Sequence, residues 1–303
     1  MTNDDGAGVA CLDGVDGVDG WSGWGIKWTS AESATGQTGD DENQCVVLVK
    51  TMKYLSAIVL AALCFASAAP AEPKPPVELK PQLAQLGTLL LEENFSGAAL
   101  PQKWQPGGRP NSFSVVDGAL RGVAQPDDAH GPAISAPIEG HNLTVAFRMK
   151  FAEAGYFLFL IDGDSQFGGQ AHLLRFALAP GQEQLAQDRG TPASHAAQGA
   201  AHAAAQKAGT KLPTPSPEEL ADPKFYRTES LAKQPAKTAD GEWHQVLIEL
   251  VGNDALAQMD DLPPMRGKGT VLDAKKSRIV FLVGSSGTVL VSNVRVWENQ
   301  PKP

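Results

Sequence analysis

Apolar and polar side chains alternate most regularly between Leu143 and Phe151. The odd-numbered positions of this stretch are all apolar, whereas the even-numbered positions are small, polar or charged. A period of two places one face of a strand in a core and the other toward water. The stretch therefore predicts a half-buried β-strand.

Other short apolar runs follow one another, separated by turn residues. Asp117-Gly118 separates Ser114–Val116 from Ala119–Val123, and glycine accepts the positive φ that a two-residue hairpin turn requires. Tyr156–Ile161 is apolar throughout, which indicates that both of its faces are covered. Further predicted strands are Leu89–Phe95, Ala171–Ala179, Gln182–Gln187, His244–Val251, Ala255–Met259, Ile279–Val283 and Val289–Trp297. Many short strands punctuated by Gly, Pro and Asp predict an all-β sandwich or barrel.

Residues 191–237 interrupt this succession of strands. They combine an alanine-rich stretch with six prolines and two interrupting glycines, and they offer no apolar stripe that could dock on a core. We interpret this segment as a long irregular or partly helical surface insertion, with a short helix near Pro217–Leu220. An insertion of this length is either functional or disordered.

The beginning of the chain has the organisation of an export signal. Met52-Lys53 precedes the apolar run Tyr54–Phe65, and two Ala-x-Ala sites follow between Ala66 and Ala71. A basic start, a short apolar run and such a site are typical of a secretory signal peptide, predicted here over residues 52–71. The run is short for a membrane span, although an uncleaved signal anchor is the alternative. The expected location is secreted or periplasmic, with no membrane attachment after cleavage.

The segments on either side of this signal differ in character from the strands. Residues 1–51 hold nine acidic residues and two lysines, which is −7 of the formal net charge of −9, and no helix or strand period persists in them. We predict that they are a disordered gene-model extension and that translation begins at Met52. Residues 72–88 read as a Pro-rich linker, residues 89–298 as one domain, and residues 299–303 as a tail.

Charge and cysteine content exclude some classes of function. Residues 72–303 carry a formal charge of only −3 and show no clustered basic stretch of the kind expected of a nucleic-acid-binding protein. All three cysteines precede residue 72, so an exported chain would depend on its core and not on disulfides. The oligomeric state is not indicated.

Several landmarks occur in an order that resembles a known family. They are Leu91–Phe95, Trp104, Phe113–Arg121, Leu143–Phe151, the Asp-Gly-Glu-Trp-His block that begins at Asp240, and Ser292–Glu298. This order resembles the concanavalin A-like, LamG-like sandwiches and, among them, the 3-keto-disaccharide hydrolase group. The resemblance implies a two-sheet antiparallel jelly roll whose first and last strands lie near each other. It also implies work on saccharides outside the cytoplasm, by binding or by hydrolysis of keto-sugar glycosides.

Candidate catalytic residues lie on two of the predicted strands. A period of two places His172 with Leu174 on one face of its strand and Arg175 on the other, and His172 is a candidate acid or base. Asp260 ends a second strand and completes the candidate set His172, Arg175 and Asp260. The alternative for His172 is a half-buried structural histidine. Glycoside hydrolysis uses a pair of carboxylates, and the Glu-x-Asp-x-x-Glu pattern of sandwich glucanases is absent from this sequence.

Asp162 and Asp164 are a candidate calcium site. They lie two positions apart in a Gly-rich segment after a buried strand, and carboxylates in such loops can bind Ca²⁺. The segment does not follow the EF-hand pattern, because Phe167 and Leu173 stand where Gly and Glu would be required. An ordinary polar turn is the alternative, and no other cofactor is indicated.

Trp243 and His244 open the strand that best marks the fold. His244 shares a face with Val246 and is expected to pack at the edge of the core, whereas Trp243 points to the opposite face. Trp243 is either a sugar-stacking platform or a structural plug. The sequence thus leaves two functions open, a keto-disaccharide hydrolase and a non-catalytic carbohydrate-binding or surface-interaction module.

Overall fold

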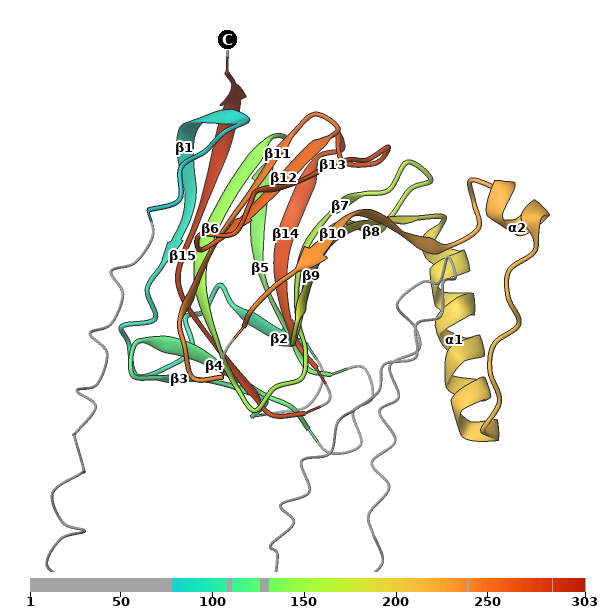
Figure 1. Ribbon diagram of the computed structural model, residues 1–303, viewed down its shortest axis with the longest axis horizontal. Coiled ribbons are helices and arrows are strands. Elements are labelled where there is room, and N and C mark those ends of the chain that lie inside the picture. The colour runs from blue at the N-terminus through green and yellow to red at the C-terminus, as the bar shows by residue number, and fades with distance from the viewer. Residues whose placement is uncertain (1–77, 108–110, 126–130, 239, 285, 303) are drawn as a thin grey trace, which may run out of the picture. The chain divides into compact units, whose positions relative to one another are not determined.

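A computed structural model describes residues 78–107, 111–125, 131–238, 240–284 and 286–302 of the chain. Within them, two antiparallel sheets pack face to face, as Figure 1 shows. The predicted fold class, a two-sheet jelly-roll sandwich, is confirmed by this strand pairing. The predicted export signal and the segment before it lie outside the described residues.

Sheet A has eight strands in the described part of the chain. Its order is β13-β12-β11-β6-β15-β4-β3, and β1 pairs with the last strand, β15. The bounds are β1 Ala84–Glu93, β3 Phe113–Val116, β4 Ala119–Val123, β6 Leu143–Ala152, β11 His244–Val251, β12 Asp254–Met259, β13 Met265–Lys268 and β15 Thr288–Pro301. The pairing of β1 with β15 confirms that the first and last strands lie together, as the family resemblance implied.

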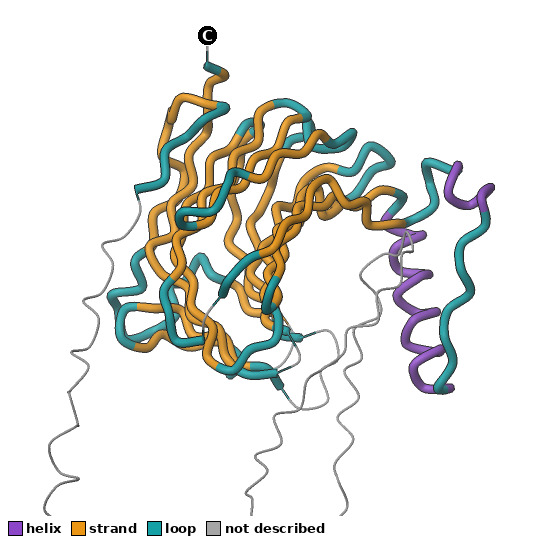
Figure 2. The backbone as a smooth tube through the Cα atoms, viewed as in Figure 1, coloured by secondary structure: helices purple, strands orange, loops and turns teal. Residues whose placement is uncertain are grey.

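Sheet B has seven strands in the same part of the chain, in the order β10-β9-β8-β7-β14-β5-β2. The bounds are β2 Gln105–Gly107, β5 Ala133–Gly140, β7 Phe157–Asp164, β8 Gln170–Ala179, β9 Gln182–Arg189, β10 Arg227–Pro235 and β14 Lys276–Val283. Two helices, α1 Pro192–Ala208 and α2 Pro217–Ala221, connect β9 to β10, and Figure 2 shows them apart from the strands. Neither helix is long and apolar enough to cross a membrane.

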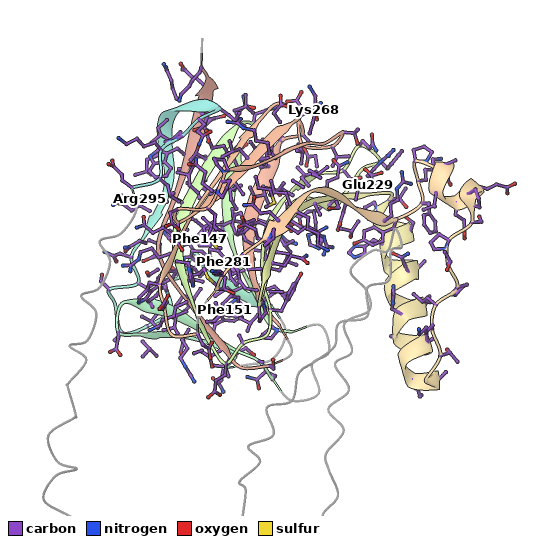
Figure 3. All side chains as sticks on the ribbon, in the orientation of Figure 1. Phe147, Phe151, Glu229, Lys268, Phe281 and Arg295 are labelled. Carbon is purple, nitrogen blue, oxygen red and sulfur yellow. The ribbon has the colours of Figure 1, made fainter. Side chains whose placement is uncertain are left out.

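The core lies between the two sheets and is rich in aromatic rings. Phe147 of β6 lies 5.3 Å, centroid to centroid, from Phe281 of β14, so the two sheets meet ring against ring (Figure 3). Trp104 stacks on Phe281 at 5.6 Å and is almost fully buried, so it is a core residue and not a surface platform. Such aromatic pairs contribute beyond the area they bury.

Local sequence signals explain the cleanest hairpin. Asp117 and Gly118 both adopt positive φ, 50° and 73°, between β3 and β4. This is the geometry of a type I′ turn, whose twist matches that of paired strands. The alternation from Leu143 is also confirmed, because its odd positions are buried in the core.

The predicted insertion is shorter and more ordered than expected. Residues 192–208 form a 17-residue helix, and the short helix predicted near Pro217 is α2. Residues 227–235, assigned to the insertion, instead form β10, the edge strand of sheet B. Its alternation is hidden because polar side chains occupy both faces. Two boundaries also move: β1 begins at Ala84, inside the predicted linker, and β15 extends into the predicted tail.

Candidate functional site

The outer face of sheet B, turned away from the core, carries a connected set of polar side chains, most of them ionisable. The register places them on one face, because Arg175 pairs with Leu160 and Ala186, and Asp188 pairs with Thr228. We call this set the outer-face network. Its members are Asp162, His172, Arg175, Asp188, His195, Tyr226, Thr228 and Arg278.

A β-bulge brings His172 onto this face. Ile161 pairs with Leu174, but the next residue, Asp162, pairs with His172, so Leu173 is an extra residue in β8. A bulge of this kind re-aims the side chains beyond it. The prediction that His172 shares a face with Leu174 is therefore wrong: Leu174 lies in the core, and His172 lies with Arg175 on the outer face.

Asp162 is the centre of the first half of the network. Its side chain is fully buried, and its Oδ1 lies 2.6 Å from His172 Nδ1. Its other oxygen, Oδ2, accepts a hydrogen bond from Arg278 Nε at 2.6 Å. The imidazole is thereby oriented by a buried carboxylate, while about a quarter of the histidine side chain (23%) stays accessible.

Asp188 is the centre of the second half. Arg175 binds it through two nitrogens, with Nε 2.7 Å from Oδ1, and Tyr226 and Thr228 each donate a hydroxyl at 2.8 Å. Burial alone would raise the pKa of Asp188, but the adjacent Arg175 guanidinium outweighs burial and holds that pKa below its usual range. Both carboxylate oxygens are thus occupied by donors.

Burial and charge within this group also shift the pKa values of Arg175 and Tyr226. Burial would lower the pKa of Arg175, but the charge and hydrogen bonds of Asp188, together with Tyr226 and Tyr156, outweigh burial and raise that pKa. Burial raises the pKa of Tyr226 to about 12, so its hydroxyl stays protonated and can donate to Asp188. The network is therefore a charge-paired and hydrogen-bonded unit at neutral pH.

Helix α1 contributes one ring to this face. Its start is set by Thr191, whose hydroxyl accepts a hydrogen bond from Ser194 N, and by Pro192 in the first turn. His195 then stacks on Tyr226 with ring centroids 4.2 Å apart and lies 5.7 Å from the ring of His172. The helix that the sequence placed in a loose insertion therefore helps to build the site.

The structure does not bring Asp260 to this network. Asp260 follows β12 of sheet A, where its Oδ2 lies 2.7 Å from His244 Nδ1 and its Oδ1 accepts from Gln245 N. His172 and Arg175 belong to sheet B. Of the three predicted catalytic residues, two are therefore together and the third is part of a separate His–Asp pair. His244 is buried at the core edge, as predicted.

The two predicted calcium ligands, Asp162 and Asp164, lie in different surroundings. Asp162 is enclosed by His172 and Arg278, whereas Asp164 is exposed at the end of β7. No group of three or more His, Cys, Asp or Glu side chains that could hold a metal ion occurs among the residues the structure describes. The carboxylate of Asp162 is occupied by Arg278 and His172 of the protein itself, and the predicted calcium site keeps only Asp164.

A cavity of about 480 Å³ lies beside the network, at one end of the sandwich. We call it the end cavity. Its polar lining residues are Asp164, Ser165, Gln166, Asp188, Asn253, Thr270, Asp273 and Lys275. Because Asp188 lines the cavity and belongs to the outer-face network, the two features are adjoining parts of one region.

Hydrogen bonds fix the loops that form the end cavity. Asn253, in the turn from β11 to β12, accepts Gly269 N through its carbonyl and Asp273 N through Oδ1. Gln187 Oε1 accepts Thr270 N at 2.8 Å. These contacts tie the segment between β13 and β14 to both sheets, so the polar lining is held in place without a ligand.

Sequence reasoning missed several members of this region. Asp188, Tyr226, His195 and Arg278 come from elements far apart in the chain, and their relation depends on strand register and on the β8 bulge. One signal was present: β9 holds the acids Glu183 and Asp188 among mainly amide and apolar side chains. Acids are rarely fully buried unless they are paired, so an acid in such a strand is a candidate for a buried pair.

Comparisons with known proteins give no family assignment. No family model matches the chain, and no curated protein matches it. Among solved structures, LamA from Zobellia galactanivorans, in complex with laminaritriose and laminaritetraose, is 12% identical with a TM-score of 0.46. That match covers 71% of this chain and 100% of LamA.

Two further structures have similar scores. SCLam, a non-specific endo-β-1,3(4)-glucanase of family GH16, is 13% identical with a TM-score of 0.46, over 74% of this chain and 96% of that one. A protein of unknown function with a galectin-like fold from Bacillus subtilis is 11% identical with a TM-score of 0.47, over 73% and 100%. Likenesses of this degree carry no conclusion about ligand or activity.

Proposed function

We propose that this protein binds a saccharide and that the end cavity is the binding site. The observation that carries the proposal is the lining of that cavity, which combines carboxylate, amide and hydroxyl side chains on loops fixed by Asn253 and Gln187. Such groups are the donors and acceptors that sugar hydroxyls require. The volume of about 480 Å³ lies in the range of small-molecule sites.

The outer-face network supports the site from behind. Arg175, Tyr226 and Thr228 hold Asp188 in one position, so the part of Asp188 that lines the cavity is fixed before a ligand arrives. A site that is ordered in advance loses less entropy on binding. The proposal therefore assigns the network a supporting role and assigns ligand contact to the residues of the end cavity.

Binding without reaction fits the carboxylates of the outer-face network, and the predicted catalytic Asp260, better than hydrolysis does. A glycosidase uses two carboxylates that act as acid, base or nucleophile on either side of the scissile bond. Asp162 and Asp188 each have both oxygens bonded to donors within the protein, and Asp260 lies on the other sheet. A carboxylate enclosed in this way is a poor proton carrier.

One observation favours a second candidate, hydrolysis of a keto-sugar glycoside as the family resemblance implies. His172 is partly accessible and is oriented through Nδ1 by a buried carboxylate, which is a geometry that general bases use. If the protein is such an enzyme, it will release monosaccharide from a 3-keto-disaccharide, and His172→Gln will abolish the release. No release by the unaltered protein rules this candidate out.

The test of binding is a titration of neutral disaccharides and a glycan array against the purified protein, followed by calorimetry on the best ligand. We expect Asp164→Asn and Asn253→Ala each to weaken binding about tenfold or more, because each removes hydrogen bonds to hydroxyls. Asp117→Asn, in the exposed β3–β4 turn, is the matched control and should bind normally. Unchanged affinity in both cavity variants would refute the assignment.

A saccharide partner also fits an extracytoplasmic location, which we propose on the basis of residues 52–71. Their basic start, apolar run and Ala-x-Ala sites support export. N-terminal sequencing of the exported protein should find a start close to residue 72, and recovery of the protein only in the cytoplasm would contradict this location.

A further inference from the structure

The outer face of sheet A carries a second polar surface that shares no residue with the end cavity. The odd residues of β6 are in the core, so Arg148 and Lys150 point outward, and Leu120 in the core places Arg121 of β4 outward as well. We call Arg121, Arg148, Lys150 and Trp243 the sheet A patch.

Strand register sets the spacing of this patch. Leu290 of β15 pairs with Lys150 on one side and with Arg121 on the other. The two cations are therefore two strands apart, about 10 Å in a sheet with strands roughly 5 Å apart. Arg148 lies two residues along β6 from Lys150, on the same face, so the three positive charges form one compact group.

Trp243 completes the surface on the side of β11. Its ring lies 5.0 Å from the Cζ of Arg148 and 5.1 Å from the Nζ of Lys150. A cation at this distance from an indole ring is attracted to it. The tryptophan is half-buried, and it places an aromatic ring beside two positive charges.

The three cations have no carboxylate partner within the described part of the chain. The other two arginines in the strands of sheet A have side-chain partners. Arg295 is paired with Glu92, and Arg266 donates a hydrogen bond to Gln82. The acids nearest in sequence to the patch are Asp117, Glu153, Asp240 and Glu242, and none of them forms an ion pair with a patch cation among the described residues; Asp240 instead accepts the backbone N–H of Glu153 with both oxygens. Positive charge therefore remains uncompensated on this face.

Arg148 adds a more specific sign of a missing partner. Its Nε is buried, and no acceptor for it is found among the described residues. A buried donor without an acceptor costs free energy, more so when it is charged. An anionic group from outside the protein would supply both the acceptor and the compensating charge.

From these observations we propose that the sheet A patch binds an acidic polysaccharide, one that carries carboxylate or sulfate groups on its sugar rings. The cations recognise the anionic groups, and the indole of Trp243 offers an apolar surface to a sugar ring. Nucleic acid fits less well, because residues 72–303 carry a formal charge of −3 and three cations are few for a phosphate backbone.

The experiment measures binding of polygalacturonate to the full protein by calorimetry, with dextran, double-stranded DNA and anionic phospholipid vesicles as competing classes. We expect polygalacturonate to bind, more weakly as salt rises from about 50 to about 200 mM, because paired charges are screened. Dextran should not bind at this patch. Tighter binding of DNA or vesicles than of polygalacturonate, or dextran binding that the sheet A patch variants weaken, overturns the proposal.

Variants locate the interaction. Arg121→Gln combined with Lys150→Gln should weaken polygalacturonate binding about tenfold or more, and Trp243→Ala should weaken it separately. Lys268→Gln is the matched control, because Lys268 is an exposed cation on β13 of the same sheet but outside the sheet A patch (Figure 3). This variant should bind polygalacturonate normally. Wild-type affinity in the double variant, with an unchanged melting temperature, would refute the assignment.

The end-cavity variants keep the two sites apart. Asp164→Asn and Asn253→Ala should leave polygalacturonate binding unchanged, since neither residue belongs to the sheet A patch. A failure of neutral saccharides to bind at the end cavity would therefore not contradict acidic polysaccharide binding at the sheet A patch. Likewise, a failure of polygalacturonate to bind would not contradict the proposal for the end cavity.

Discussion

The outer faces of the two sheets carry similar kinds of side chain in opposite states. On sheet B, Asp188 is buried, Arg175 is mostly buried, and the two are bonded to each other and to their neighbours. On sheet A, Arg148 and Lys150 lie beside an indole ring without a carboxylate partner among the described residues. The comparison teaches that a paired charge holds a fold together and a site in shape, whereas an unpaired charge is available to a ligand.

The largest effect is expected from breaking the sheet B pair. Asp188→Ala leaves the Arg175 guanidinium buried without its counter-charge, and removal of one partner of a buried pair costs roughly 3–5 kcal/mol of unfolding free energy. Urea unfolding followed by circular dichroism measures this. The control is Glu92→Gln, which breaks a pair with both side chains 54% exposed and should cost about 1 kcal/mol or less.

A loss below about 1 kcal/mol in Asp188→Ala would contradict the comparison. It would mean that the pair on sheet B is no more structural than a surface salt bridge.

The next largest effect is a dependence of stability on pH, and it comes from Glu183 of β9, a carboxyl with no cationic partner among the described residues. Glu183 lies on the core side of the strand that carries Asp188, and burial, together with the charge of Asp260, raises its pKa to about 7, although a hydrogen bond from Gln234 opposes the rise. The folded protein therefore retains a proton that the unfolded chain releases near pH 4.5. Stability from this group is full below about pH 4.5 and is lost as pH rises toward 7.

Between about pH 4.5 and pH 7 the free energy of unfolding should fall by an amount on the order of 3 kcal/mol because of this group. Glu183→Gln should abolish this pH-dependent fall. Urea unfolding at several pH values between about 4.5 and about 8 tests this expectation. The control is Glu218→Gln, which alters an exposed acid of α2. Equal pH dependence in Glu183→Gln and the wild type would show that this carboxyl is ionised in the folded state.

The smallest effect is expected on sheet A. Lys150→Gln removes a cation that forms no ion pair in the described structure, so the free energy of unfolding should change by no more than about 0.5 kcal/mol. The same urea titration measures it. A loss above about 1 kcal/mol would show that Lys150 supports the fold, and the contrast between the two faces would then be weaker than we describe.

The elements that the sequence predicted best are those with a local cause. The alternation from Leu143 and the Asp117-Gly118 turn depend only on neighbouring residues, and both are confirmed. β5 and β10 were not predicted, because β5 contains Pro137 and β10 has polar residues on both faces. Proline lowers the strand signal, and edge strands often carry charge and proline.

The candidate site was harder to predict than the fold. His172 and Arg175 were singled out for their chemistry, yet the bulge at Leu173 that places both on one face is not visible in the sequence. Asp188 and Tyr226 reach Arg175 through strand pairing between distant segments. Asp260 was grouped with them as a candidate carboxylate at the end of a predicted strand, and it belongs to the other sheet.

The central claim is that a neutral saccharide binds in the end cavity, and a crystal structure of the protein grown with its best neutral ligand tests it most directly. We expect an ordered sugar whose hydroxyls contact Asp164 and Asn253, with the Arg175–Asp188 pair unchanged behind it. A sugar found on Trp243 instead, or an empty end cavity at saturating ligand concentration, would contradict the account.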